Sequence, residues 1–414
     1  MQALGLGNSD VGQKRSQNED RYVVNDELGL YVVSDGMGGH AAGEVAAETA
    51  IRAVVEQVEA ASGELQRQDG STTDAARLLD IGRTAVEHAC AEVYRLATSS
   101  SEYSGMGCTL TLLLLSGNRA TLAHVGDTRL YLHRGGQTYQ MTTDHTFSAE
   151  LVRSGYLKRE DAKKHMYSNV LTRCIGSQPA VHVDTLSFEI FSGDRFLLCS
   201  DGLTEYVPDL DWLAKSLSTK ELSEIPKNLV AFANDSGGHD NITAVVVGVD
   251  DTTPEAQEPR RDSLYDNDAL SGVFLFHSLP LVQLEHVRSA LKVRLCGAGE
   301  TLIAEGDPNS TLWIVADGSV QVLKDNTAIA LLGPGGHVGT ATLLCRRAAG
   351  GTLRTGEPSR VLELEGQALM QLAHADPWLG LTLLEKLAAW LSGNLAPGNG
   401  STRTLQATAP DRWF

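Results

Sequence analysis

The segment Val33-Ser-Asp-Gly-Met-Gly-Gly-His40 decides the fold, because a run of apolar residues ends there in an aspartate and a glycine-rich turn. Four more aspartates lie directly after an apolar run or inside a short polar turn: Asp20, Asp127, Asp201 and Asp240. Singly, an Asp-Gly pair after a strand is most often only a turn, since aspartate caps it and glycine accepts positive φ. Together, carboxylates at strand ends of one sheet can converge, and they repel one another unless a hard cation neutralises them.

This set of oxygen ligands indicates which metal would bind. The sequence has no paired cysteines and no His-x-x-x-His among these segments, so Mg²⁺ or Mn²⁺ is favoured over Zn²⁺. Two such ions a few ångströms apart would bridge a water, lower its pKa and direct it as hydroxide at phosphorus. The aspartates therefore predict hydrolysis of a phosphoester.

Composition limits the other classes of function. The chain has 414 residues, of which 42% are hydrophobic and 21% charged, as expected for two or three globular domains. Its net charge of −18 repels phosphate backbones and anionic lipids, so neither nucleic acid nor a membrane is expected as a partner. The six cysteines form no Cys-x-x-Cys pair, and residues 1–16 lack the apolar stretch of a secretory signal. We expect a soluble, cytoplasmic protein.

A polar stretch with two prolines, residues 251–268, is predicted to be a linker between two domains. In residues 1–250, short apolar runs alternate with helical windows, which predicts an α/β or α+β mixture. In residues 269–394, closely spaced short strands with glycine turns predict a small β-barrel or roll that ends in a helix stopped by Gly393. Residues 395–414 are expected to form a loose tail.

Seven segments of residues 1–250, in order, resemble a bacterial member of the metal-dependent protein serine/threonine phosphatases, the type 2C class. They are Arg-x-x-Asn-Glu-Asp (15–20), Asp-Gly-Met-Gly-Gly-His (35–40), Gly-Cys-Thr-Leu-Thr (107–111), His-Val-Gly-Asp-Thr-Arg (124–129), Leu-Thr-Arg-Cys-Ile-Gly (171–176), Cys-Ser-Asp-Gly-Leu-Thr (199–204) and His-Asp-Asn-Ile-Thr (239–243). The resemblance implies an α+β fold, a four-layer α-β-β-α sandwich. It also implies two Mn²⁺ or Mg²⁺ ions, with a third in bacterial members.

The resemblance implies a role for each matching position. Asp35 matches the carboxylate that bridges both metals, and the carbonyl of Gly36 matches a ligand of one of them. Asp201 and Asp240 match the remaining direct ligands, and Asp127, with Asp201, matches the site of the weaker third metal.

The positions around these ligands are implied to handle water, substrate and protons. Glu19 and Asp20 match an acidic pair that holds metal-bound water, and Arg15 matches the arginine that binds the substrate phosphate. For Arg15, a solvated surface charge is the alternative. Met37 stands where animal members have a histidine proposed as general acid, and a thioether has no proton to donate. His40 is the nearest candidate, although a role in capping local backbone is the stronger alternative.

Residues 147–170 resemble a bacterial segment, the flap, that lies beside the active site. The flap contains six basic residues in an acidic protein: Arg153, Lys158, Arg159, Lys163, Lys164 and His165. They form either a solvated helix face or a patch that steers acidic phosphopeptides toward the metals.

The chain from Leu270 onward resembles a cyclic-nucleotide-binding domain, a jelly-roll-like β-roll with flanking helices. The resemblance is carried by Ala298–Pro308, Leu312–Val322 and Leu332–Gly339. Active members have a glutamate that binds the ribose, where this chain has Thr340, and an arginine that pairs with the cyclic phosphate, for which Arg347 is the candidate. A cyclic nucleotide, another anionic ligand and a ligand-free docking role to a protein partner stay open.

The sequence therefore predicts a Mn²⁺- or Mg²⁺-dependent phosphatase that removes phosphate from serine and threonine of proteins phosphorylated by a cognate Ser/Thr kinase. The second domain is expected to regulate or target it. Two alternatives are a non-catalytic scaffold that senses a nucleotide and a hydrolase of a small phosphoester. Retention of Asp35, Asp201 and Asp240 argues against the scaffold, because clustered carboxylates have no stabilising value of their own.

Overall fold

The computed structural model describes residues 2–38, 42–65, 72–250 and 261–395. The chain forms two compact units, Met1–Gln257 and Glu258–Phe414. Each unit has its own sheets and its own apolar core. They are described separately below.

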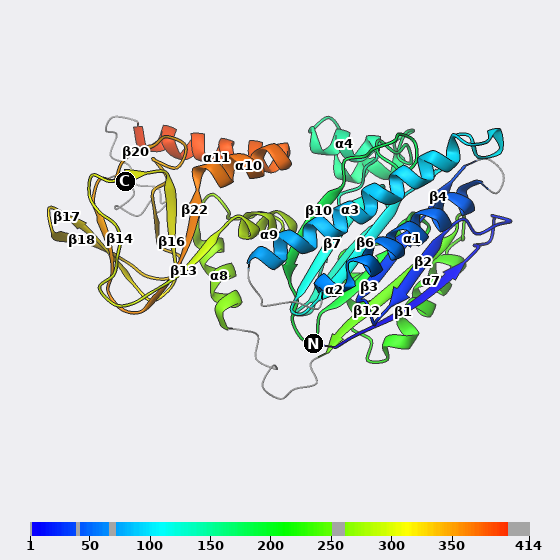
Figure 1. The fold of residues 1–414 in the computed structure, drawn as a ribbon, viewed down its shortest axis with the longest axis horizontal. Coiled ribbons are helices and arrows are strands. Elements are labelled where there is room, and N and C mark those ends of the chain that lie inside the picture. Colours follow the sequence, from blue (N-terminus) through cyan, green and yellow to red (C-terminus); the bar gives the residue numbers. More distant parts are fainter. Residues whose placement is uncertain (1, 39–41, 66–71, 251–260, 396–414) are drawn as a thin grey trace. The chain divides into compact units, whose positions relative to one another are not determined.

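Two antiparallel five-stranded sheets form the centre of the first unit (Figure 1). The first sheet has the order β1 (Gln2–Asp10), β12 (Ile242–Asp250), β11 (Arg195–Cys199), β8 (Arg129–Arg134) and β9 (Gln137–Gln140). The second has the order β10 (Asp184–Glu189), β7 (Arg119–Val125), β6 (Leu110–Ser116), β3 (Leu30–Ser34) and β2 (Arg21–Asn25). Every residue of β3 and β6 is buried, because one face meets helices and the other meets the opposite sheet.

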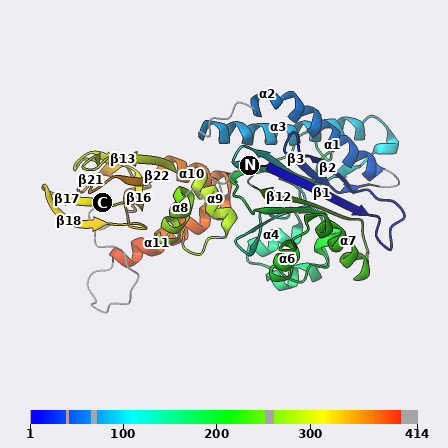
Figure 2. The ribbon, with the colours of Figure 1, turned by 90° about the horizontal axis from the view of Figure 1, so that it is seen from below.

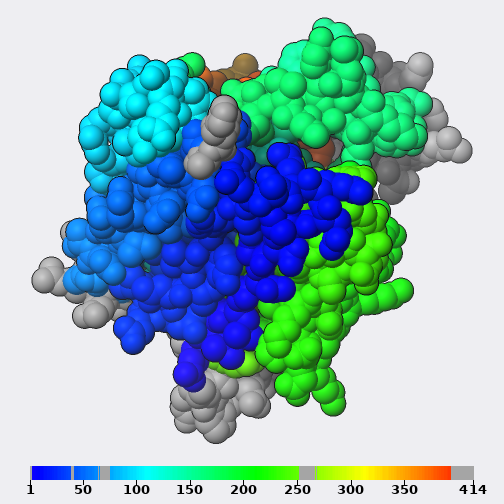
Figure 3. Space-filling model, turned by 90° about the vertical axis from the view of Figure 1, so that its right-hand side faces the viewer, coloured from blue at the N-terminus to red at the C-terminus, as the bar shows by residue number. Residues whose placement is uncertain are grey.

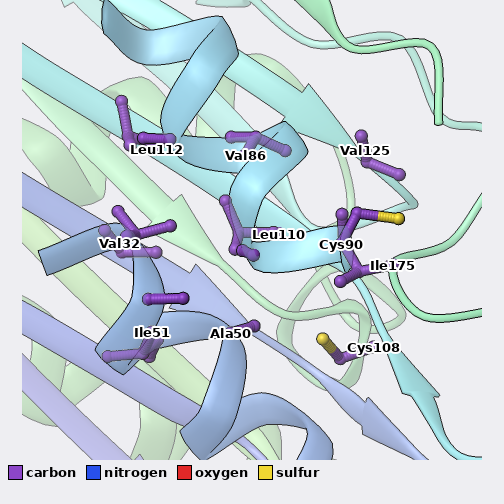
Figure 4. Packing of buried hydrophobic residues seen from close by; sticks show 14 of the residues in the cluster. Val32, Ala50, Ile51, Val86, Cys90, Cys108, Leu110, Leu112, Val125 and Ile175 are labelled. Atoms are coloured by element: carbon purple, nitrogen blue, oxygen red, sulfur yellow. The ribbon is translucent and has the colours of Figure 1, made fainter. Parts of the chain in front are cut away.

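Helices cover the outer faces of both sheets. Helices α1 (Ala42–Ala60) and α3 (Thr72–Ala97) pack on the second sheet, where Ala50 and Val86 lie with Leu110 and Leu112 (Figure 4). On the first sheet, α6 (Leu210–Leu217) and α7 (Ile225–Asp235) bury leucines against β11 and β12. Figure 2 shows helices above and below the paired sheets. The predicted four-layer α-β-β-α sandwich is confirmed.

Short elements connect these layers. Strands β4 (Gly36–Met37) and β5 (Gly107–Cys108) pair beside α1, and the one-turn helix α5 (Asp201–Thr204) follows β11. The flap contains α4 (Phe147–Arg153) and the 3₁₀ helix η2 (Arg159–Lys164). The remaining short helices are α2 (Ser62–Leu65), η1 (Ser101–Tyr103) and η3 (Leu222–Glu224).

The second unit is built on two four-stranded antiparallel sheets, which confirms the predicted β-roll with flanking helices. One sheet has the order β13 (Lys292–Cys296), β22 (Ser359–Glu365), β16 (Thr311–Asp317) and β19 (His337–Val338). The other has the order β14 (Thr301–Ile303), β21 (Thr352–Thr355), β17 (Val320–Lys324) and β18 (Thr327–Leu332), and β15 (Pro308–Asn309) pairs with β20 (Arg347–Ala348). The helices are α8 (Arg261–Gly272), α9 (Leu281–Ser289), α10 (Gly366–Ala375) and α11 (Pro377–Leu395).

Helix α8 begins at Arg261, inside the range 251–268 that is predicted to be a linker. In this helix the Asp266 carboxylate is buried and accepts two 2.9 Å hydrogen bonds from the Arg360 guanidinium on β22. Helix α11 also extends past the predicted stop at Gly393, to Leu395, and residues 396–414 of the predicted tail lie outside the described residues. Among the described helices, none is long and apolar enough for a membrane span.

The Asp266–Arg360 pair gives a test of how α8 is held. Replacing Asp266 by alanine should destabilise the second unit by about 3 kcal/mol, because a largely buried ion pair with two 2.9 Å hydrogen bonds is lost. The measurement is the free energy of unfolding of the full chain in urea. Lys292→Ala, which removes an exposed pair with Glu365, is the control and should change this free energy little. Equal losses in both variants would contradict the prediction.

Candidate active site

The strand register places the predicted aspartates at one end of the sandwich. Cys199 at the end of β11 pairs with Ala244 of β12 and with Arg129 at the start of β8. In the second sheet, Val33 of β3 pairs with Thr111, so β3 ends beside the start of β6. The loops that carry the aspartates follow or precede these strand ends, so the loops come from distant parts of the chain and meet at one edge.

We call Asp20, Asp35, Asp127, Asp201 and Asp240 the acidic cluster. Burial, followed by the charges of Asp20, Asp201, Asp127 and Asp240, raises the pKa of Asp35 well above its ordinary value. Burial and the charge of Asp240 raise the pKa of Asp201 to about 6. Burial and the charge of Asp201 likewise raise the pKa of Asp127. These carboxylates therefore lie close enough to repel one another.

Asp20 is the most buried member of the acidic cluster, with 2% of its surface exposed. Its Oδ2 accepts hydrogen bonds of 2.7 Å from the hydroxyls of Ser200 and Thr243. Burial raises its pKa to about 7 against the effect of these two hydrogen bonds. Since Ser200 precedes Asp201 and Thr243 opens β12, Asp20 ties the loop before β2 to both segments.

Asp201 begins the one-turn helix α5, with Ser200 as its N-cap residue. Gly202 lies directly against the carbonyl of Asn241, where an added Cβ would come within 2.0 Å of the oxygen. The turn after β11 therefore packs tightly against the turn before β12.

Asp35 and Gly36 are fixed by backbone contacts. The Asp35 N–H donates to Thr109 Oγ1 (3.0 Å), and the Thr109 N–H donates to the Asp35 carbonyl (2.8 Å). A Cβ on Gly36 would lie 2.1 Å from the carbonyl oxygen of Gly43 in α1. Only glycine fits at this position, because a Cβ would clash with a backbone atom of α1, which cannot move away as a flexible side chain could.

Asp240 is paired with Arg15, the predicted phosphate-binding residue. Arg15 Nη2 donates to Asp240 Oδ2 at 2.6 Å, and the arginine side chain is 52% exposed. The next residue, Asn241, holds the loop that carries Arg15: its Nδ2 donates to the carbonyls of Val11 and Gln17, and its Oδ1 accepts from the Glu19 N–H. Arg15 is therefore aimed at the acidic cluster and is not a free surface charge.

Asp127 follows Gly126, whose φ of +112° favours glycine. The loop is held by His145, which is fully buried. His145 Nδ1 accepts from the Gly126 N–H (3.0 Å), and its Nε2 donates to Asp184, which also binds Arg173 (2.6 Å). The hydrogen bonds fix the His145 tautomer and, through Gly126, the position of Asp127.

The acidic cluster fits a divalent metal by its donor chemistry. Asp20 Oδ1 and Asp201 Oδ1 are buried and have no hydrogen-bond partner among the described residues. Oxygen ligands of this kind suit Mg²⁺ and Mn²⁺. Within the described part of the chain, however, no three His, Cys, Asp or Glu side chains have the spacing of a preformed metal site.

Several residues that organise the site were not singled out from the sequence. They are Thr109, Asn241, Ser200 and Thr243, which lie inside the matching segments but were assigned no role, and which hold the acidic residues and their loops through hydrogen bonds. Their only sequence signal was membership of these segments. Of the remaining predicted residues, Met37 lies on β4 and His40 lies outside the described residues.

The flap forms a raised blue-green lobe beside the dark-blue N-terminal residues (Figure 3). Both of its ends are held by backbone hydrogen bonds, from Phe147 N–H to Val170 and from Thr172 N–H to His145. Lys163 donates to backbone carbonyls outside the flap, so it is not one of the freely solvated charges of the predicted basic patch. The other exposed basic residues of η2 and its N-cap are Lys158, Arg159 and Lys164.

The second unit offers a poor fit to a cyclic nucleotide. Arg347 is exposed on β20, while Thr340 and Thr342 are buried. Thr342 Oγ1 accepts a 2.9 Å hydrogen bond from Asn309, which is 1% exposed. The polar side chains of residues 340–342 are therefore hydroxyl groups, and this segment has no carboxylate that could bind a ribose.

Two family models match the chain. Residues 10–244, more than half of the chain, match the model of protein phosphatase 2C. Residues 293–376 match the model of the cyclic nucleotide-binding domain. The two models fall on separate units of the structure.

Known proteins resemble the first unit. The serine/threonine phosphatase stp of Listeria innocua is 34% identical over 242 residues, which cover 58% of this chain and 93% of that protein. The protein phosphatase PhpP of Streptococcus pneumoniae is 34% identical over 250 residues, 60% of this chain and 98% of PhpP. A crystal structure of the PstP catalytic domain with two manganese ions has a TM-score of 0.52 and 34% identity, over 60% of this chain and 99% of that one.

The matching segments span the whole acidic cluster, from the loop before β2 to the start of β12. This chain belongs to the protein phosphatase 2C family of metal-dependent serine/threonine phosphatases and carries a C-terminal cyclic nucleotide-binding domain.

Proposed function

We propose that this protein hydrolyses phosphoserine and phosphothreonine in other proteins at the acidic cluster, with two Mn²⁺ or Mg²⁺ ions. One observation carries the proposal: two buried carboxylate oxygens, Asp20 Oδ1 and Asp201 Oδ1, have no hydrogen-bond partner among the described residues, in a cluster of mutually repelling aspartates. Such oxygens are costly to bury unless a cation binds them.

The predicted ligands divide this task. Asp35, Asp201 and Asp240 would hold the two ions together with the Gly36 carbonyl, and Asp127 would contribute to a weaker third position. When bound, the ions supply positive charge at the phosphate and an activated water for attack on phosphorus. The close packing of Gly36 on Gly43 keeps its carbonyl in a fixed place.

Arg15 and Asp20 would act on the substrate and on water. Arg15 now pairs with Asp240 and is half exposed, so its guanidinium can turn to bind two oxygens of a phosphate. Asp20 is held through Oδ2 by Ser200 and Thr243, which leaves Oδ1 to accept a hydrogen bond from water in the cluster. Met37 carries no titratable proton, so leaving-group protonation is not assigned to its position.

The second unit would regulate or target the phosphatase without binding a cyclic nucleotide in the usual way. Thr340 cannot replace the ribose-binding carboxylate, and the loss of a charge-assisted hydrogen bond costs about 1.5–3 kcal/mol. A protein partner or another anionic ligand is therefore the expected binding partner of this unit.

Asp201→Asn tests the catalytic proposal. With Mn²⁺, this variant should lose two to four orders of magnitude, roughly, in kcat/KM toward an aryl phosphate and a phosphothreonine peptide, since a direct ligand is weakened. Asp211→Asn, an exposed change on α6, is the matched control and should keep full activity. Without metal, Asp201→Asn should have a higher melting temperature than wild type, because one charge of the acidic cluster is removed. Full activity in Asp201→Asn would exclude the proposal.

The exposed flap cations test substrate steering. Arg159→Glu with Lys164→Glu should raise KM for an acidic phosphopeptide and leave KM for an aryl phosphate unchanged, because only the peptide carries charges that reach the flap. The control is Lys215→Glu with Lys220→Glu, two exposed changes outside the flap. Steady-state kinetics at low ionic strength measures both. Equal effects on the two substrates would remove the steering hypothesis.

Cyclic AMP and cyclic GMP test the second unit. Either nucleotide should change phosphatase activity by less than about tenfold, because a ligand shifts a conformational equilibrium only through its differential affinity. Titration calorimetry with the full chain gives the affinity directly, and Arg347→Ala reports any contact with the cyclic phosphate. Tight binding that Arg347→Ala abolishes would contradict the prediction.

A further inference from the structure

Lys163 on η2 reaches from the flap to the turn that carries Asp201. Its Nζ donates to the carbonyl of Thr204 (3.1 Å) and to that of Glu205 (3.3 Å). The residue as a whole is exposed, but its ammonium group is sheltered enough for burial, and then the charge of Arg129, to lower its pKa. This contact joins segments that are about 40 residues apart in the chain.

The two carbonyls lie at the C-terminal end of α5, where no further helical turn follows to donate N–H hydrogen bonds to them. Inside the turn, the Glu205 N–H donates to the Asp201 carbonyl (2.8 Å), and the Tyr206 N–H donates to Leu203 (3.1 Å). An ammonium group at this end is favourable both as a donor and as a positive charge. Lys163 therefore stabilises the turn at the end opposite to Asp201.

The side of α5 that faces away from Lys163 is packed closely against the turn before β12. Gly202 packs against the carbonyl of Asn241 so closely that no side chain would fit. With Lys163 on one side and Asn241 on the other, α5 has little freedom to shift. Of the neighbouring flap residues, Lys164 is exposed and shares the same short helix, so it provides an internal comparison.

We propose that Lys163 is a positioning residue: it holds the flap against α5, so that the flap and the Asp201 carboxylate move as one unit. The inference rests on the proposed function for its effect on catalysis, but the contact itself does not. A substrate that displaces the flap would then disturb Asp201. Conversely, an ordered Asp201 would favour the flap position in which Lys163 contacts α5.

Hydrogen exchange in the full chain, without metal, tests the contact. Lys163→Gln should speed exchange of the Glu205 and Tyr206 amides by about tenfold, since two hydrogen bonds from a charged donor are lost. Lys164→Gln removes the same charge from the adjacent position and should leave both amides at the wild-type rate. Unchanged exchange in Lys163→Gln, or equal acceleration in Lys164→Gln, would overturn the proposal.

Metal affinity and kinetics test the consequence for Asp201. In Lys163→Gln, Mn²⁺ titrated by calorimetry should bind about threefold to tenfold more weakly, and kcat/KM for an aryl phosphate should fall by a similar factor. Lys164→Gln should leave Mn²⁺ binding and aryl phosphate hydrolysis unchanged. An unaltered Mn²⁺ affinity in Lys163→Gln would overturn the coupling to Asp201. The wild-type protein could hydrolyse neither the aryl phosphate nor the phosphothreonine peptide while Lys163→Gln still speeds hydrogen exchange. In that case the proposed function would be wrong, but the contact between Lys163 and α5 would be supported.

Discussion

The confinement of several carboxylates at one end of a sandwich, largely away from water, is the constraint on which the rest of the first unit depends. Two like charges 4 Å apart repel by about 4 kcal/mol at an effective dielectric constant of 20, which is a large part of the stability of a domain. The protein limits this repulsion with the hydroxyls of Ser200 and Thr243 on Asp20, with Arg15 on Asp240 and with raised pKa values. Bound divalent cations would remove most of the remaining repulsion between the carboxylates. Affinity for metal and instability without metal therefore have the same cause.

The sequence was sufficient for the layers and for the residues that form the acidic cluster, because both depend on local patterns. Apolar runs marked β3, β7, β11 and β12, and aspartates stood close to one end of each. It was not sufficient for long-range hydrogen bonds: neither the three bonds of Asn241 nor the reach of Lys163 to α5 has a local signature. The pairing of Asp266 with Arg360 also has no local signature: Asp266 is polar in sequence but is buried in α8, where Arg360 donates to it. The ligand roles themselves stay predictions.

The two units differ in how far their resemblance to known families extends. In the first unit, the family model matches residues 10–244, a range that includes every residue of the acidic cluster. In the second, the β-roll is present, but the segment after β19 has the buried Thr340 and Thr342, of which Thr342 accepts a hydrogen bond from Asn309. A β-roll depends on glycines and alternating apolar residues, which are independent of any ligand. The fold can therefore persist while its binding chemistry changes.

Strands β1 and β12 pair along their full length, from Gln2 with Asp250 to Asp10 with Ile242, and Asn241 fastens the loop after β1 to the start of β12. The first and last strands of the unit are thus neighbours, and two of the five residues of the acidic cluster, Asp20 and Asp240, lie on loops that these strands position. Contacts of such separation form late in folding. A chain that is still being synthesised cannot complete the pairing of β1 with β12 until Asp250 has left the ribosome. An unfinished polypeptide would therefore lack a complete active site and could not remove phosphate from its substrates.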